Sequence, residues 1–386
     1  MKVIINTNVI LENEILYDGI VAFENERIVA VEKKSDFTIP NGAEVIDAMG
    51  LYTAPGLIDI HNHGSPDNLF IDDLEGCVNF FLEHGQTSVL PTFYQYYTAQ
   101  EMIEGAKKIK GFAKSGNGRI IKGLYMEGPY MKPTGSFQEL FKWNGDIEFS
   151  AYKDLVDNLA SYTKIWAIDP ARKNIEEFIT YVKSVEPNSR FALGHSSATA
   201  EQCEKIAPYG VKVQTHHGDS GFPPKINQAK HGAGCDEYTL VNDDLYAEII
   251  SDETGVHLAP YTIRLALKVK GRDKIILITD CNTKAGDYKN NIERGVLWGP
   301  DLNYDANGLL AGSHLTLENA CRNVMNHTGC SLVDAIKFAS INPATLIGID
   351  NDYGSIKVGK VADLILIDEN VRVKKVFLQG EKVVEN

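Results

Sequence analysis

Short β-branched apolar runs alternate with amphipathic segments at helical spacing between residues 52 and 280. Eight such runs occur, and they end near His61, Thr92, Glu127, Asp169, His195, His216, Asp252 and Asp280. The first and last ends lie 219 positions apart, so the seven steps between them average about 31 residues, close to the length of one βαβ unit. This alternation predicts parallel strands, and eight such units close into a TIM barrel.

The segments between the runs are predicted helices. They span residues 74–85, 99–116, 153–162, 174–185, 200–210 and 260–271. A doubly wound open sheet is the competing α/β fold. The number of units and the polar residues at the run ends favour the (β/α)8 TIM barrel, because catalytic groups gather at the carboxyl ends of barrel strands.

Both ends of the chain carry a different pattern. Short apolar runs such as GIVAF and ADLILID are separated by turn residues, and neither end contains a convincing helix. Each end is too short to fold well alone. We therefore expect the two ends to pair into one small β-sandwich domain, made of residues 1–53 and 354–386, beside a catalytic barrel domain of residues 54–353.

Composition narrows the class of protein. The net charge of -14 argues against a nucleic-acid partner, because phosphate binding rests on clustered Lys and Arg. The cysteines are scattered, without a C-x-x-C pair, which fits a reducing compartment, and we expect a cytoplasmic protein. The first residues do not read as a signal peptide, and no apolar run approaches the roughly 20 residues of a membrane helix.

Residues that can bind a metal stand at the ends of five of the eight runs. His61 and His63 flank Asn62, and in an extended segment residues i and i+2 point to the same side. In a barrel the carboxyl ends of the strands share one face, so residues far apart in sequence converge there. The candidate metal ligands are His61, His63, Glu127, His195, His216 and Asp280.

This ligand set predicts a metal-dependent hydrolase. Imidazole and carboxylate groups suit zinc, iron or manganese, and six ligands exceed the needs of one tetrahedral ion. They suit two divalent ions about 3.5–4 Å apart that share a carboxylate and activate water, with Glu127 as our choice for the shared group. A lone histidine here is more often structural and a lone acid more often a helix cap, but the combination favours the metal. His257, after the seventh run, faces the same side and is a candidate for substrate contact.

Several segments around these residues resemble the amidohydrolase superfamily and, within it, the N-acetylglucosamine-6-phosphate deacetylase family. The resemblance covers nearly the whole chain. It rests on APGLIDIHNHG (54–64), GQTSVLPT (85–92), MEGPY (126–130), GHSSAT (194–199), LITD (277–280), AGSHLTLENACRN (311–323) and GSIKVGKVADLILID (354–368).

The resemblance implies a barrel carrying a small β domain and the hydrolysis of an acetamide in a homodimer. His61, His63 and Asp280 would hold one ion, and His195 and His216 the other. Glu127 would be shared between the ions. Asp280 would also be the general base, accepting the proton of water and passing a proton to the departing amine.

Three departures from the family pattern concern the substrate. The segment 134–143, which includes Gln138, lacks the histidine that usually holds the substrate carbonyl. The run HHGDSG (216–221) places Asp219 and Ser220 where family members meet a sugar phosphate with Asn-Ala. No arginine occurs between Arg190 and Arg264, so that Lys225, Lys230 or His231 would have to replace the phosphate-binding arginine. We expect substrate contacts from Gln138, Asp219, Ser220, Lys225 and His257.

The leading hypothesis is a deacetylase of an N-acetylated amino sugar, phosphorylated or not. The alternative enzyme is an amidohydrolase acting on an N-acyl amino acid or a cyclic amide. A non-catalytic binding protein is a third hypothesis, but such proteins commonly lose ligands, and all six candidates are present. The aromatic segments FYQYY (93–97) and FKWNG (141–145) fit either stacking on a sugar ring or ordinary loop packing.

Overall fold

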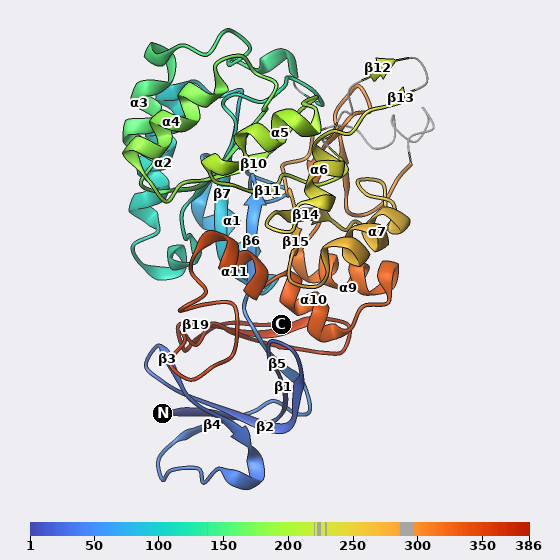
Figure 1. The fold of residues 1–386 in the computed structure, drawn as a ribbon. Coiled ribbons are helices and arrows are strands. Elements are labelled where there is room, and N and C mark those ends of the chain that lie inside the picture. Colours follow the sequence, from blue (N-terminus) through green and yellow to red (C-terminus); the bar gives the residue numbers. More distant parts are fainter. Residues whose placement is uncertain (137, 220, 222–224, 228–229, 286–296) are drawn as a thin grey trace.

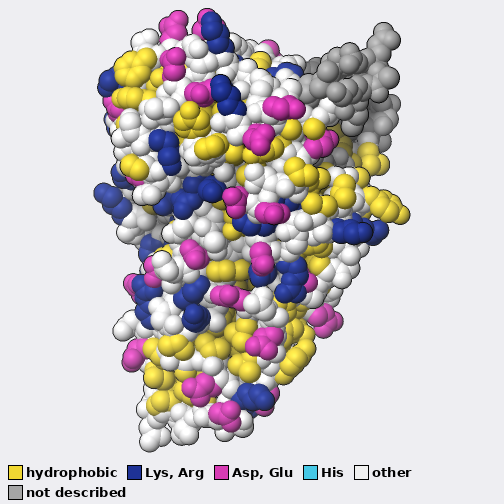
Figure 2. Space-filling model, viewed as in Figure 1, with side chains coloured by type: hydrophobic (Ala, Val, Ile, Leu, Met, Phe, Trp, Pro, Cys, Tyr) yellow, Lys and Arg dark blue, Asp and Glu magenta, His cyan; other side chains and the backbone are white. Residues whose placement is uncertain are grey.

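The computed structural model describes residues 1–136, 138–219, 221, 225–227, 230–285 and 297–386. It shows a barrel surrounded by helices and, at one end of it, a separate sheet that contains both chain termini (Figure 1). Acidic and basic side chains are interspersed over the face shown in Figure 2. In the described part of the chain, no helix combines the length and the hydropathy that a membrane crossing requires.

The central sheet has eight parallel strands in sequential order, which confirms the predicted barrel. All eight strands end within two residues of the predicted run ends. They are β6 (Leu57–Asn62), β7 (Gln86–Tyr94), β8 (Leu124–Glu127), β9 (Thr163–Ile168), β10 (Arg190–Leu193), β11 (Val211–Gln214), β14 (Tyr246–Ile250) and β15 (Ile275–Ile278). Two short pairs are inserted: β12 (Lys225–Asn227) with β13 (Lys230–His231), and β16 (Leu302–Tyr304) with β17 (Leu310–Ser313).

The barrel closes between β15 and β6, immediately beside the candidate metal ligands. The backbone N–H of Asp280 donates to the carbonyl of His61 at 2.9 Å, and the N–H of His63 donates to the carbonyl of Cys281 at 2.8 Å. Inside the barrel, Thr279 Oγ1 donates to Asp59 Oδ2 at 2.6 Å. The closing hydrogen bonds exclude the doubly wound open sheet.

The six predicted helices are present, with ends that differ from the predicted ones by local causes. The helix predicted over 200–210 ends at Ile206 because Pro208 lies in the next turn. Helix α2 begins at Ala99 as predicted, after the capping box formed by Thr98 and Glu101, but ends at Phe112. The pattern did not show α6 or the last three helices. The helices are α1 (Leu74–Glu83), α2 (Ala99–Phe112), α3 (Phe149–Leu159), α4 (Ile175–Val185), α5 (Ala200–Ile206), α6 (Cys235–Val241), α7 (Pro260–Lys270), α9 (Leu317–Thr328), α10 (Leu332–Phe338) and α11 (Ile341–Ile347), with 3-10 turns η1 (Lys34–Asp36), η2 (Gly116–Ile120), η3 (Gln138–Leu140) and η4 (Ala207–Tyr209).

The two chain ends pair with each other, as predicted for the small β domain, and the structure connects their strands into one sheet. The antiparallel pairing of β18 with β5 joins them, and Val21 and Phe23 share a buried core with Leu366 and Phe377. The limits of the two domains stay a prediction. The strands are β1 (Lys2–Ile10), β2 (Ile15–Glu24), β3 (Arg27–Lys33), β4 (Glu44–Asp47), β5 (Tyr52–Pro55), β18 (Leu364–Ile367), β19 (Val373–Leu378) and β20 (Glu381–Glu385).

Gly56 connects β5 of the terminal sheet to β6 of the barrel, and we expect Gly56→Ala to destabilise the protein. An added methyl carbon would lie 2.8 Å from Cβ of the buried, β-branched Thr87, which has little freedom to move. Overpacking of this kind costs about 1–3 kcal/mol. Thermal unfolding would measure the loss. Gly111→Ala in α2 is the matched control, because nothing lies within 4 Å of the added carbon. Equal melting temperatures for the two variants would contradict the prediction.

Candidate metal centre

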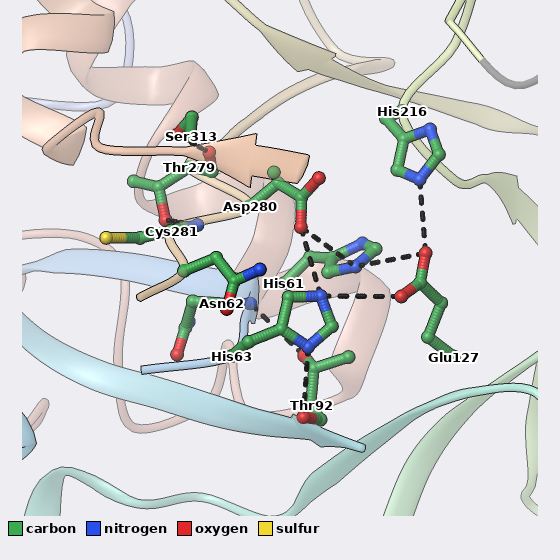
Figure 3. A network of polar contacts seen from close by, with 12 residues as sticks. His61, Asn62, His63, Thr92, Glu127, His216, Thr279, Asp280, Cys281 and Ser313 are labelled. Carbon is green, nitrogen blue, oxygen red and sulfur yellow. Dashed lines mark hydrogen bonds and ion pairs between the residues drawn. The ribbon is translucent and has the colours of Figure 1, made fainter. Parts of the chain in front are cut away.

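The six candidate ligands converge at the carboxyl ends of the barrel strands. Figure 3 shows His61, His63, Glu127, His216 and Asp280 of this set. Glu127, the last residue of β8, lies in the middle of the four imidazoles. Its Oε1 is 3.0 Å from His195 Nε2 and 3.2 Å from His216 Nε2. Its Oε2 is 3.3 Å from His63 Nε2, and Oε1 is 3.8 Å from His61 Nε2.

Asp280 completes the side of the centre that holds the H-x-H pair. Its Oδ1 is 3.1 Å from His63 Nε2 and 3.8 Å from His61 Nε2. Asp280, His195 and His216 all have positive φ values, of 49°, 41° and 24°. This conformation is costly for residues other than glycine, and such strain concentrates at functional sites. Here the backbone turns each side chain toward the centre just after its strand ends.

Three of the imidazoles are held by hydrogen bonds at the nitrogen that faces away from the centre. His61 Nδ1 lies 3.2 Å from Glu248 Oε2, and His63 Nδ1 lies 3.2 Å from the carbonyl oxygen of Thr92. His195 Nδ1 lies 3.2 Å from Thr134 Oγ1. An imidazole that donates from Nδ1 presents the lone pair of Nε2 to a metal. These hydrogen bonds therefore direct the Nε2 atoms of His61, His63 and His195 at the carboxylates.

Polar atoms at the centre are buried without hydrogen-bond partners. Within the described part of the chain, these include His61 Nε2, His63 Nε2 and Asp280 Oδ1. An unsatisfied buried polar group costs about 1–3 kcal/mol. A cation between these atoms would coordinate them, so the residues present fit a metal ion.

The buried carboxylates of the centre also favour a bound cation. Burial opposes ionisation of Glu127, but His195, His216 and His63 outweigh it and hold its pKa well below the usual range. Burial likewise opposes protonation of His63, yet Asp280 and Glu127 raise its pKa to about 8. For His216, burial is outweighed mainly by Glu127, which raises its pKa to about 10. The carboxylates stay anionic and draw positive charge, which protons or metal ions can supply.

Two groups of residues can each hold a metal ion, and Glu127 belongs to both. Within each group the ligand atoms lie within 4.8 Å of one another. The groups are His61, His63 and Glu127, and Glu127, His195 and His216. The position of Glu127 in both groups is therefore compatible with the prediction that the two ions share it.

A cavity of about 180 Å³ opens onto the candidate ligands Glu127, His195, His216 and Asp280. Tyr94, Tyr96 and Phe141 form aromatic parts of its wall. Polar and small residues complete the lining, among them Gln95, Thr134, Ser136, Asp219, His257 and the segment 309–312.

The predicted substrate residues fall in different places. His257 and Asp219 line the cavity. Gln138 is exposed in η3 and is not among the lining residues, whereas Thr134 and Phe141 of the same segment are. Ser220 lies outside the described residues, and Lys225 lies in β12 with a side chain outside the described part. The side chains of Lys230 and His231 also lie outside it.

His257 is positioned by a carboxylate. Its Nδ1 is 3.2 Å from Asp252 Oδ2, and its Nε2 is 3.3 Å from the carbonyl oxygen of Gly312. Burial opposes protonation of His257, but Asp252 outweighs it and raises the pKa. His217, by contrast, turns away from the centre, and its Nδ1 contacts Gln214 Oε1 at 2.6 Å.

Sequence reasoning missed several residues that contact the candidate ligands, among them Tyr94, Thr134 and Glu248. The ring of Tyr94 stacks on His63 with centroids 3.4 Å apart and an interplanar angle of 8°. Thr134 and Glu248 hold His195 and His61, as described above. The aromatic run 93–97 could have predicted a role for Tyr94, whereas no sequence motif points to Thr134 or Glu248.

Comparison with known proteins identifies the family. The model of the amidohydrolase family matches residues 52–383. The chain belongs to the amidohydrolase family. The resemblance noted in the sequence is thereby confirmed, and the barrel with its terminal sheet is the scaffold on which this amidohydrolase carries its candidate metal centre.

The curated relatives of this amidohydrolase span nearly the same length. It is 29% identical over 344 residues to the N-acetylgalactosamine-6-phosphate deacetylase of Escherichia coli O157:H7, covering 85% of this chain and 86% of that one. It is 27% identical to the N-acetylglucosamine-6-phosphate deacetylase of Haemophilus influenzae, over 98% of both chains. Among solved structures, the N-acetylglucosamine-6-phosphate deacetylase of Pasteurella multocida matches over 100% of both chains with a TM-score of 0.85 and 25% identity.

Removing metal should destabilise the wild-type protein, and Glu127→Gln should abolish this effect. A ligand present at 1,000 times its dissociation constant stabilises the folded state by about 4 kcal/mol, and Glu127 belongs to both groups of ligands. Melting temperatures measured after chelation and again after zinc addition test this. Glu318→Gln is the matched control, because Glu318 pairs with His84 away from the centre, at 2.8 Å. A zinc-dependent shift in Glu127→Gln as large as in the wild type would refute the assignment.

Proposed function

We propose that this chain hydrolyses the amide bond of an N-acetylated amino sugar with the help of two divalent metal ions. The observation that carries the proposal is the pair of ligand groups sharing Glu127 beneath an aromatic-walled cavity. The curated relatives support it, because they are deacetylases of N-acetylated amino sugar phosphates.

We assign one ion to His61, His63 and Asp280, and the other to His195 and His216. Glu127 contacts imidazoles of both sets and is the proposed bridge. Zinc is our first choice for this nitrogen and oxygen ligand set, and iron or manganese are the alternatives. When bound, such ions acidify a water molecule and polarise a substrate carbonyl.

Asp280 is the proposed general base and general acid. Burial opposes its ionisation, but His63 and His61 lower its pKa, so that the carboxylate is ready to accept a proton at neutral pH. It faces the cavity beside Glu127 and His216. We propose that it takes the proton of the attacking water and delivers a proton to the departing amine nitrogen.

The cavity wall fits a sugar ring better than an extended acyl chain. Tyr94, Tyr96 and Phe141 contribute aromatic side chains to its lining, and aromatic rings of this kind can pack against the apolar face of a sugar. Tyr97 and Trp143 of the same two segments contact each other instead, through Trp143 Nε1 and the carbonyl of Tyr97 at 2.8 Å. We propose that His257, fixed by Asp252, binds a sugar hydroxyl.

The oligomeric state of the protein and its location in the cell stay predictions. The resemblance to the deacetylase family implies a homodimer with a small-molecule substrate. The scattered cysteines predict a cytoplasmic location. Sedimentation of the purified protein would test the oligomeric state.

Asp280→Asn should lower kcat about 10²–10⁴-fold, because asparagine presents an oxygen to a metal but cannot accept the proton. Metal content and substrate binding should change much less. Steady-state kinetics with elemental analysis of the same preparations would separate the two effects. A variant that keeps more than about a tenth of the wild-type kcat would show that Asp280 does not have this role.

The preference for a 6-phosphate should be weaker than the names of the relatives suggest. The described residues that line the cavity include three carboxylates, of Glu127, Asp219 and Asp280, and no lysine or arginine. Each missing charge-assisted contact lowers affinity by about 1.5–3 kcal/mol, and about 1.4 kcal/mol is a factor of ten. The measurement is kcat/KM for N-acetylglucosamine and N-acetylgalactosamine, each with and without the phosphate.

Asp219→Asn is the matched variant for this comparison. It removes one negative charge from the cavity and should raise kcat/KM for the phosphorylated sugar relative to the free sugar. N-acetyl amino acids in the same panel test the alternative substrate class. A preference of about a hundredfold or more for a 6-phosphate in the wild type would correspond to roughly 2.7 kcal/mol and would refute the prediction.

A further inference from the structure

A further carboxylate lies in the interior of the barrel behind the metal centre. Glu248 is the third residue of β14, and its side chain is 0% exposed. Its Oε2 lies 3.2 Å from His61 Nδ1 and accepts the backbone N–H of His216 at 3.3 Å. Both partners belong to candidate metal ligands, one from each of the two ligand sets.

The burial of this carboxylate needs a compensating charge. Removing an ion from water into a protein interior costs several kcal/mol even after relaxation. In the described structure, the side-chain cation within reach of Glu248 is His61, and no lysine or arginine pairs with it. His61 itself points Nε2 toward Glu127 and Asp280. Positive charge at the metal centre is therefore the charge that can stabilise Glu248, transmitted through the imidazole.

The candidate ligands differ in the charge of the group that contacts their Nδ1 atom. His63 Nδ1 faces the neutral carbonyl of Thr92, and His195 Nδ1 faces the neutral hydroxyl of Thr134. His61 alone among these three has a carboxylate at hydrogen-bond distance. A carboxylate behind an imidazole fixes its tautomer, holds the ring in place and makes Nε2 a stronger donor to the metal.

We propose that Glu248 is a positioning residue that strengthens the binding of the ion held by His61, His63 and Asp280, here called the inner ion. Its carboxylate accepts the Nδ1–H of His61 and adds a negative charge behind that ligand. The outer ion would be held by His195, whose Nδ1 lies beside the neutral Thr134, and by His216, whose Nδ1 lies 3.8 Å from Asp219 Oδ2, beyond hydrogen-bond distance. This inference rests on the proposed two-ion centre and concerns which residues set the affinity of each ion.

Two substitutions of similar volume separate the hydrogen bond from the charge. Glu248→Gln keeps an oxygen acceptor and loses the charge, whereas Glu248→Met loses both. Loss of such a supporting residue weakens metal binding about 10–100-fold. We expect the full weakening of the inner ion in Glu248→Met and a smaller one in Glu248→Gln. Glutamine keeps an oxygen acceptor for the backbone N–H of His216, so Glu248→Gln should leave the outer ion unchanged. Thr134→Val is the reciprocal variant and should weaken the outer ion alone.

The experiment is a zinc titration of metal-free protein in competition with a chromophoric chelator, which resolves two dissociation constants. The step that is missing in His63→Ala identifies the inner ion. The visible spectrum of Co²⁺ at the inner site should also change in Glu248→Met, because the donor strength of His61 changes. Retention of the outer ion with wild-type affinity shows that Glu248→Gln is folded.

An inner dissociation constant equal to that of the wild type in Glu248→Gln would overturn the role of the charge and with it the proposal. That measurement decides the matter even if Glu248→Met does not fold. A wild-type protein that binds no inner ion would instead overturn the two-ion centre itself. The two failures are therefore distinguishable.

Discussion

The functional site depends on the contacts between the carboxylate of Glu127 and the four imidazoles around it. Glu127 is 4% exposed and lies within 3.8 Å of four imidazole nitrogens that come from the ends of different strands or from the H-x-H pair. A buried anion of this kind is stable only when positive charge surrounds it. The strained backbone of His195 and His216 is the local cost of bringing their rings to that carboxylate.

The backbone hydrogen bonds that close the barrel also bring candidate metal ligands together. The N–H of Asp280 binds the carbonyl of His61, so two candidate ligands 219 positions apart in sequence are joined by one hydrogen bond of the closing sheet. Sites carried by strands are held more rigidly than sites carried by loops. The terminal sheet adds to this rigidity, because β5 continues through Gly56 directly into β6.

The cavity above the centre is built differently from the centre itself. Its wall comes largely from segments beyond the strand ends, including Tyr96, Thr134, Phe141 and Asp219. Connecting segments vary more among related proteins than the strands they join. This difference explains why the sequence predicted the candidate metal ligands more readily than the residues that line the cavity.

Much of the fold and of the candidate metal centre could be predicted from the sequence, because both follow from local periodicity. Strand lengths, the repeat of about 31 residues and the His, Glu and Asp residues at the strand ends are properties of short stretches of chain. Helix ends were less predictable, since α2 and α5 end where individual turns fail to continue. The exposed position of Gln138 was not predictable either, because it depends on the path of a long loop.

The sequence by itself thus determined the barrel, the pairing of the two ends and the set of candidate ligands. Only the tertiary structure decided which residue contacts the Nδ1 atom of each histidine ligand. Glu248 meets His61 across 187 positions of sequence, and Thr134 meets His195 across 61. No periodicity encodes these contacts, because they depend on the curvature of the closed barrel and on loops that fold back over it.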